Sequence, residues 1–262
     1  MSTEGTGRRD QLLLVAAVAV VLSASWGWLI AGAGMDMNAV EMTAMAGMDG
    51  WLMQPATWTA GYALLIFGMW WTMMVAMMLP SATPVLLLHA RVARGAKVVN
   101  GTLTSTALFA AGYLLAWGGF SLLATAAQWG LETARVLSPM LETSNRWLGA
   151  GILLAAGVWQ LTPLKAGCLR HCRSPLSFLV GHWRDGRLGA LRMGLEHGVF
   201  CLGCCWFLML LLFFGGVMNL YWIVGLTLFV LLEKTVPRGH WFGRVAGVAL
   251  IGCAASLVAG LG

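Results

Sequence analysis

The sequence predicts an all-α protein, a polytopic bundle of transmembrane helices with about seven spans. The first observation is composition: 59% of the residues are hydrophobic and only 10% are charged, whereas a soluble domain carries roughly 25% charged residues. The second is that apolar residues come in runs of about 20 separated by short loops, the length that crosses a bilayer. We therefore expect a single integral membrane domain over residues 1–262, with the lipid bilayer as its first partner.

A third observation orients the bundle. Lysine and arginine gather in alternate loops, at residues 8–9, 91–97, 165–192 and 234–244, against only Arg135 and Arg146 on the other side. The positive-inside rule then predicts a cytoplasmic N-terminus. The net charge of +6 follows from these loops, so we expect no nucleic-acid partner. Because most of the six cysteines lie in helices or beside a basic loop, they do not read as a disulfide framework.

The chain begins with a cytoplasmic tail, residues 1–11, which carries Arg8 and Arg9. The first apolar run follows at residues 12–33. It is longer than the core of a usual signal peptide, which favours an uncleaved signal anchor over a cleaved or twin-arginine signal.

An extracytoplasmic loop rich in methionine is expected at residues 34–56. Its methionines are Met35, Met37, Met42, Met45, Met48 and Met53. Thioethers bind Cu(I) and are weak ligands for hard ions, so the loop could capture Cu(I). The alternative is a partly buried loop in which methionine is an adaptable filler.

The second span is expected at residues 57–79. Met73 and Met77 fall on one helical stripe near the middle of the bilayer, together with Trp70. Such a stripe either packs in the core or faces a metal site. Residues 81–100, which include His89, are expected to form a solvated basic loop on the near side. The third span should cover residues 103–127, followed by a far-side loop at 128–146.

The fourth span, residues 147–161, leads into a basic cytoplasmic segment at 163–188. Cys168, His171 and Cys172 form a C-x2-H-C cluster there. Three soft ligands in five residues could hold a metal at the cytoplasmic mouth, with His182 as a fourth, since a structural zinc site normally needs four. The alternative is a pair of reduced thiols in an interfacial segment whose arginines touch lipid head groups.

The segment from residue 193 to 219 is long and apolar enough to span the bilayer and carries the most chemistry. His197, Cys201 and Cys204 (i, i+4, i+7) fall on one narrow stripe, and Cys205 follows. Metal-binding groups inside a membrane helix are costly and are therefore functional candidates. One imidazole and two thiols suit Cu(I), with Zn(II) as the other possibility. Glu196 lies off this stripe, where it can pair with Arg192.

Two further spans are expected, at residues 221–232 and 245–261. The first is short, so the fifth and sixth spans either both cross or form a helical hairpin. Cys253 in the last span is expected to pack.

Two stretches resemble a known bacterial family. They are M-W-W-T-M-M-V-A-M-M-L-P-S-A-T-P at residues 69–84 and the stretch that runs from Q-L-T-P-L-K-A-G-C-L-R-H-C-R-S-P to H-G-V-F-C-L-G-C-C-W-F-L-M and G-V-M-N. The family is that of predicted metal-binding integral membrane proteins, and the resemblance covers about residues 58–234. It implies metal binding in the bacterial inner (plasma) membrane but no established reaction. Its characteristic positions here are Met73, Met74, Met77, Met78, Pro80, Ser81, Pro84, Lys165, Cys168, Cys172, Pro175, His197, Cys201, Cys204, Cys205, Met209, Met218 and Asn219.

Three functions compete. The first is the handling of Cu(I), by transport or by delivery to a cuproenzyme or copper carrier, with metal ligands among His197, Cys201, Cys204, Cys205, Met73, Met77, Cys168, His171 and Cys172. The second is a non-catalytic subunit or assembly factor with membrane-complex or homo-oligomer partners. The third is a thiol oxidoreductase that uses Cys201-x2-Cys204. We assign no catalytic residue and find no nucleotide-binding motif of an ATP-driven pump.

Overall fold

The computed structural model is a bundle of helices. It describes residues 3–35, 37–45, 57–96, 101–138, 141–143 and 145–260, and within these ranges the only β structure is an isolated bridge between Leu137 and Thr143. The helices are α1 (Thr3–Ile30), α2 (Ala39–Ala44), α3 (Ala60–Gly95), α4 (Thr102–Thr133), α5 (Arg146–Leu161), α6 (Pro163–Arg173), α7 (Pro175–His182), α8 (Gly186–Leu210), α9 (Leu212–Gly215), α10 (Leu220–Thr235) and α11 (Gly239–Ala259).

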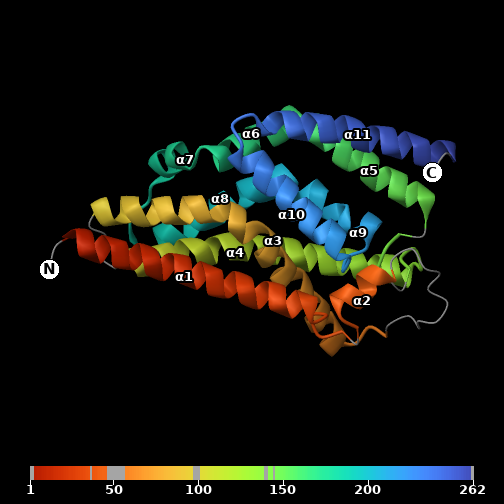
Figure 1. The fold of residues 1–262 in the computed structure, drawn as a ribbon, viewed down its shortest axis with the longest axis horizontal. Helices are drawn as coiled ribbons and strands as arrows, with labels where there is room; N and C mark the ends of the chain where they lie inside the picture. The colour runs from red at the N-terminus through yellow and green to blue at the C-terminus, as the bar shows by residue number, and fades with distance from the viewer. Residues whose placement is uncertain are drawn as a thin grey trace.

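The bundle is layered (Figure 1). Helix α1 runs along one side against α3, and α3 packs on α4. Helices α5 and α11 pair along the opposite side, and α8 and α10 lie between the two groups. The all-α prediction is confirmed, and α8, which carries four of the nine predicted ligands, lies inside the bundle.

Fewer helices are long enough to span a membrane than the seven expected. Among the described residues five helices qualify by length and apolar composition, or six if the bent pair α5–α6, with 65° between its halves, is counted as one span. Helices α5 and α10 have 16 residues each. At about 1.5 Å per residue that is about 24 Å, short of the roughly 30 Å hydrocarbon core. Thr162 and Pro163 end α5, because the Thr162 side chain caps α6.

The prediction of a loop at residues 81–100 is wrong for most of that stretch, which is helical. Helix α3 continues to Gly95, through Pro80 and Pro84. His89 is fully buried, with its Nδ1 3.1 Å from the Thr106 hydroxyl and its ring against Phe109. The basic residues of this stretch therefore extend a long helix beyond the apolar region, where Arg94 lies 3.8 Å from Asp10 of α1.

Other expected loops are also partly helical. Helix α2 lies in the predicted methionine loop, α4 continues to Thr133, and the basic segment at 163–188 folds into α6 and α7. The methionine loop is only partly described: Met48 and Met53 lie outside the described residues.

Glycines let α4 and α8 approach closely. A Cβ at Gly194 would lie 1.9 Å from the Phe109 carbonyl oxygen, and one at Gly112 would lie 2.0 Å from that of Leu191. Small residues allow such backbone contact in membrane bundles. One face of α8 is thereby fixed against α4, and its other faces meet α6, α5 and α10.

Candidate metal centre

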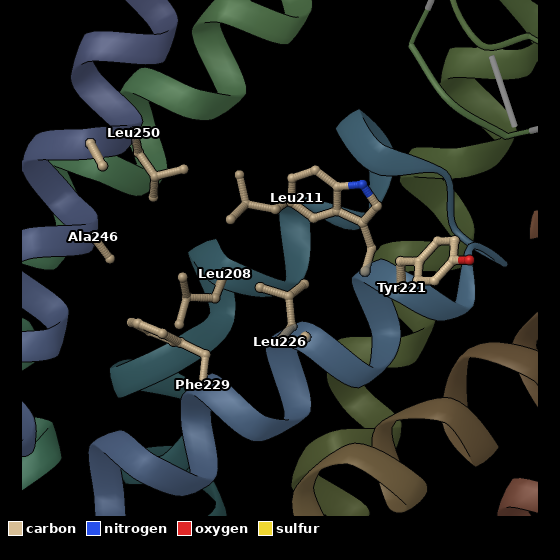
Figure 2. A pocket seen from close by; sticks show the side chains of 10 residues that line it. Leu208, Leu211, Tyr221, Leu226, Phe229, Ala246 and Leu250 are labelled. Carbon is tan, nitrogen blue, oxygen red and sulfur yellow. The ribbon is translucent and has the colours of Figure 1, made fainter.

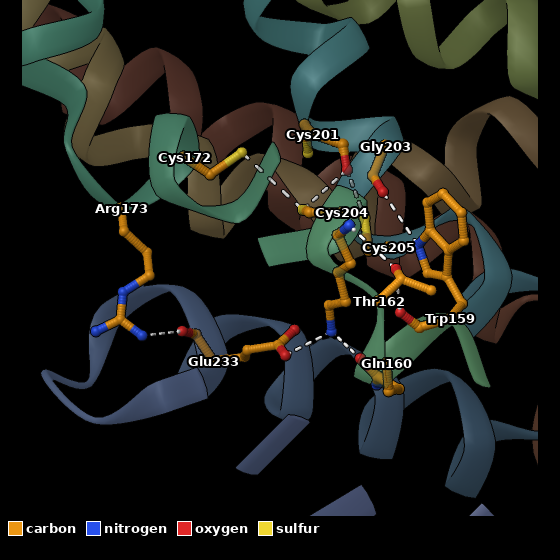
Figure 3. A network of polar contacts seen from close by, with 11 residues as sticks. Trp159, Gln160, Thr162, Cys172, Arg173, Cys201, Gly203, Cys204, Cys205 and Glu233 are labelled. Carbon is orange, nitrogen blue, oxygen red and sulfur yellow. Dashed lines mark hydrogen bonds and ion pairs between the residues drawn. The ribbon is translucent and has the colours of Figure 1, made fainter. Parts of the chain in front are cut away.

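The candidate centre lies where α6 crosses α8. Cys204 is fully buried on α8, and Cys172 reaches it from α6 with 4.0 Å between the two sulfurs (Figure 3). The sequence places these residues 32 positions apart in two separate candidate clusters. The fold merges one thiol from each cluster into a pair.

Cys201 lies one turn before Cys204, and two polar side chains contact its sulfur. The Lys234 ammonium nitrogen lies 3.0 Å from its sulfur and the Tyr113 hydroxyl lies 3.2 Å from it. Lys234 comes from α10, is only 8% exposed and also bonds the Ser81 hydroxyl at 3.2 Å. A buried cation at this place can compensate one negative charge in the surrounding group of sulfurs.

A thioether completes this group of sulfurs. The Cys205 sulfur lies 3.9 Å from the Met78 sulfur of α3. The thiols of Cys204 and Cys205 both donate to the Cys201 carbonyl oxygen, at 3.0 and 2.9 Å. Soft sulfur atoms from α3, α6 and α8 therefore meet within one buried region.

The predicted methionine stripe and the methionine that follows it, Met78, lie on different faces of α3. Met73 and Met77 are buried in the apolar core of α3, and Met78, the next residue, has its sulfur 3.9 Å from the Cys205 thiol. A one-residue step turns a helical side chain by about 100°. The stripe read from the sequence thus marks a buried face of α3, and the sulfur contact lies beside it.

The three residues of the C-x2-H-C cluster, on α6, contact three different residues of α8. Cys168 packs on Gly203: a Cβ atom added to Gly203 would lie 2.6 Å from the Cys168 sulfur. Cys172 lies against Cys204. The His171 ring stacks on Phe200 at 4.1 Å between centroids. Within the described ranges, no three His, Cys, Asp or Glu side chains come together to hold a metal. The part of the chain that the structure describes therefore holds no closed site of three or four such ligands.

His197 is buried one turn before Cys201 among aromatic rings. Its ring centroid lies 5.0 Å from that of Phe178 and 5.8 Å from that of Tyr113. Its Nδ1 has no hydrogen-bond partner among the described residues. His197 is thus an available nitrogen ligand beside the sulfur group.

The sulfur pair has a separation that suits a shared metal ion. A disulfide needs about 2.05 Å between sulfurs, far less than the 4.0 Å between Cys172 and Cys204. Two metal–sulfur bonds of about 2.3 Å, the length in zinc thiolates, separate the sulfurs by up to about 4.6 Å. One ion with two thiolate ligands fits this gap with little movement.

A second polar cluster lies beside the sulfurs (Figure 3). The Lys165 ammonium group bonds the carboxylate of Glu233 and the side-chain oxygen of Gln160. Lys165 and Glu233 are only 2% and 1% exposed. Arg173 donates to the carbonyl oxygens of Glu233 and Val236, at 3.2 and 2.7 Å, which ties α6 to the end of α10.

Sequence reasoning missed Lys234 and Tyr113. Lys234 stood among the topology markers because it ends a short apolar span. The signal was present in Glu233-Lys234, two adjacent charges at the end of such a span. The expected pairing of Arg192 with Glu196 is confirmed at 3.3 Å, and Arg184 joins it at 2.9 Å.

An apolar pocket of about 370 Å³ lies apart from the sulfurs, between α8, α10 and α11 (Figure 2). Its lining residues are Leu208, Leu211, Tyr221, Trp222, Gly225, Leu226, Phe229, Ala246, Ala249 and Leu250. This lining contains no thiol, imidazole or carboxylate, so the pocket does not suit a metal ion.

Comparison with known proteins adds one finding. Residues 67–257 match the model of a family described as PpoB2, copper chaperone. The match includes α6, α8 and α10, which carry Cys172, Cys204 and Lys234. No curated protein and no solved structure matches the chain.

Proposed function

The chain belongs to the PpoB2 family of copper chaperones, and on that premise we propose that it holds Cu(I) on Cys172 and Cys204 and delivers it to a cuproenzyme. The observation that carries the proposal is the 4.0 Å gap between the two sulfurs, which come from separate helices. Thiolate and thioether ligands select soft ions such as Cu(I). Cys201, Cys205 and Met78 supply further soft atoms around the pair.

Charge supports a monovalent ion. Cu(I) on two thiolates carries one net negative charge, and the buried Lys234 ammonium balances it. Zn(II) on the same two thiolates would be neutral, so the nearby ammonium would be left without a counter-charge. Since uncompensated buried charge is costly, the site favours Cu(I).

The surroundings support delivery rather than tight storage. Cys168 and Cys172 are half-buried, whereas Cys204 and Cys205 are fully buried. A ligand near the surface can exchange its metal with a carrier, and a site with few ligands releases it readily. Cys168 and His197 are the reserve ligands on the two sides of the pair.

The membrane setting follows from the same proposal. Several helices are long and apolar enough to span a membrane, and we place the chain in the bacterial inner membrane with a cytoplasmic N-terminus. The segment at 163–188 then faces the cytoplasm and the methionine loop at 34–56 faces outward. That loop would collect Cu(I), and Met73 and Met77 would line the path of the ion to the thiols.

A transfer assay tests delivery. The protein is reconstituted in liposomes and loaded with one equivalent of Cu(I) under reducing, anaerobic conditions. A soluble Cu(I) chelator is then offered on one side only. We expect the wild type and Cys253→Ser, which removes an exposed thiol, to hold Cu(I) and release it to the chelator.

The Cys172→Ser/Cys204→Ser variant should retain much less Cu(I) than the wild type and release correspondingly little. Movement of copper from one side of the liposome to the other would favour transport. Equal copper content in the wild type and the double variant would refute the proposal. In that case titration of an exchangeable Cys172–Cys204 disulfide would test the oxidoreductase alternative.

A further inference from the structure

Two imidazoles near the sulfur pair are not used by it. His171 lies on α6, and His182 is the last residue of α7. Their ring centroids are 6.2 Å apart, with 75° between the ring planes. Both side chains are half-buried, so the pair is reachable from outside the bundle.

Each ring has one nitrogen committed to the backbone. Nδ1 of His171 lies 3.0 Å from the Gly167 carbonyl oxygen, and Nδ1 of His182 lies 3.0 Å from that of Phe178. A carbonyl oxygen only accepts, so Nδ1 of both rings carries a proton, and in the neutral form of each ring Nε2 keeps its lone pair. A backbone carbonyl in this role is the usual outer partner of a metal-ligating histidine.

Aromatic rings fix the orientation of both histidines. His171 stacks on Phe200 with centroids 4.1 Å apart and planes within 3°. His182 stacks on Phe178 with centroids 4.8 Å apart and planes within 19°. Ligands held in this way lose little freedom when they bind an ion, which is the arrangement that a site requires.

The separation of the ring centroids leaves room for one bridging ion when both Nε2 atoms face it. A metal–nitrogen bond is about 2.0 Å long, and a ring nitrogen lies roughly 1.1 Å from its centroid, so two imidazoles in line with one ion have centroids about 6.2 Å apart. The observed distance is 6.2 Å. Imidazole is a good ligand for copper, and two ligands in line need no third group.

We infer that His171 and His182 form a second Cu(I) site, lined by nitrogen, through which the ion enters or leaves the thiol pair. His171 precedes Cys172 directly in the chain, so the two sites share α6. The inference rests on the proposed function, because it takes Cu(I) as the ion. It assigns the half-exposed end of α6 and α7 as the place of exchange.

X-ray absorption at the copper edge tests the inference on the full-length protein in detergent. One equivalent of Cu(I) should give a sulfur signal, because thiolates bind it more tightly. A second equivalent should add a signal from two nitrogen ligands. The His171→Ala/His182→Ala variant should lose the nitrogen signal and one equivalent of copper, while His240→Ala, an exposed histidine on α11, should lose neither.

A single substitution keeps the inference testable if the double variant fails to fold. His182→Ala removes a half-buried ring at the end of a short helix, and we expect at least tenfold weaker binding of the second equivalent. A wild type that binds one Cu(I) through sulfur alone would overturn the inference and leave the proposed function standing. Cu(I) bound by nitrogen alone, with no sulfur-bound ion, would support the inference and overturn the proposed function. The Cys172→Ser/Cys204→Ser variant should keep the nitrogen signal.

Discussion

Glu233 and Lys234 are neighbours on α10, yet they serve two different buried clusters. Glu233 bonds the Lys165 ammonium group, and the oxygen of Gln160 completes that set. Lys234 turns to the sulfur of Cys201 and the hydroxyl of Ser81. Successive residues of a helix differ by about 100° in direction, so one turn of α10 supplies both clusters.

The two clusters differ in what their charges face. In the Glu233 cluster a lysine meets a carboxylate, whose oxygens are hard ligands. In the Lys234 cluster the cation faces sulfur, a soft ligand that also binds metal. We therefore read the first cluster as a structural tie between α6 and α10, and the second as the counter-charge of a metal site.

The largest effect on binding should come from the sulfur pair. Changing Cys172 and Cys204 together to serine removes both proposed ligands, and we expect Cu(I) affinity to fall at least 100-fold. Competition against a Cu(I) chelator measures it. Cys253→Ser is the matched control, and equal affinity in all three proteins would contradict the role of the pair.

The Glu233 cluster should respond in stability instead. Lys165→Met leaves the Glu233 carboxylate buried without its cation, which costs about 3–5 kcal/mol. Thermal unfolding in detergent should show the loss, and Lys165→Met/Glu233→Leu should recover much of it. Cu(I) bound per folded molecule should stay unchanged. If Lys165→Met lost Cu(I) affinity without losing stability, the Glu233 cluster would belong to the metal site.

Lys234 should affect selectivity. Lys234→Met removes the counter-charge, and we expect Cu(I) affinity to fall about tenfold relative to Zn(II), or about 1.4 kcal/mol. Lys234→Arg keeps the charge and serves as the control. The ratio of the two affinities is the measurement. A ratio that is the same in Lys234→Met and the wild type would mean that the ammonium group only supports packing.

The smallest effect is expected at the methionine loop. Met35 and Met42 are partly buried against the core, and leucine has a similar volume and no sulfur. Met35→Leu/Met42→Leu should leave thermal stability within about 0.5 kcal/mol and slow Cu(I) loading of proteoliposomes only a few-fold. Loading that stops entirely would make the loop a required entry site.

The fold class was predictable because apolar runs and basic loops follow directly from the bilayer. The burial of His197, Cys201 and Cys204 on α8 was predictable for the same reason, since the helical period places them on one stripe. The count of spans was not, because Thr162 and Pro163 bend one apolar run and α10 is short. The continuation of α3 was missed because Pro80 and Pro84 resemble a helix end.

The pairing of Cys172 with Cys204 was beyond the sequence. Periodicity describes one helix at a time and contains no information on how α6 crosses α8. Lys234 was missed for a similar reason: a lysine at the end of a span normally points to the interface, and only the packing of α10 turns it inward.

The most direct test is the ligand set of the first Cu(I) ion. Copper-edge X-ray absorption of the wild type with one equivalent of Cu(I) should show two sulfur ligands at about 2.2–2.3 Å, close to the length of other metal–thiolate bonds. The signal should vanish in Cys172→Ser/Cys204→Ser and persist in Cys253→Ser. A first ion bound only by nitrogen or oxygen, or a sulfur signal unchanged in the double variant, would contradict the account.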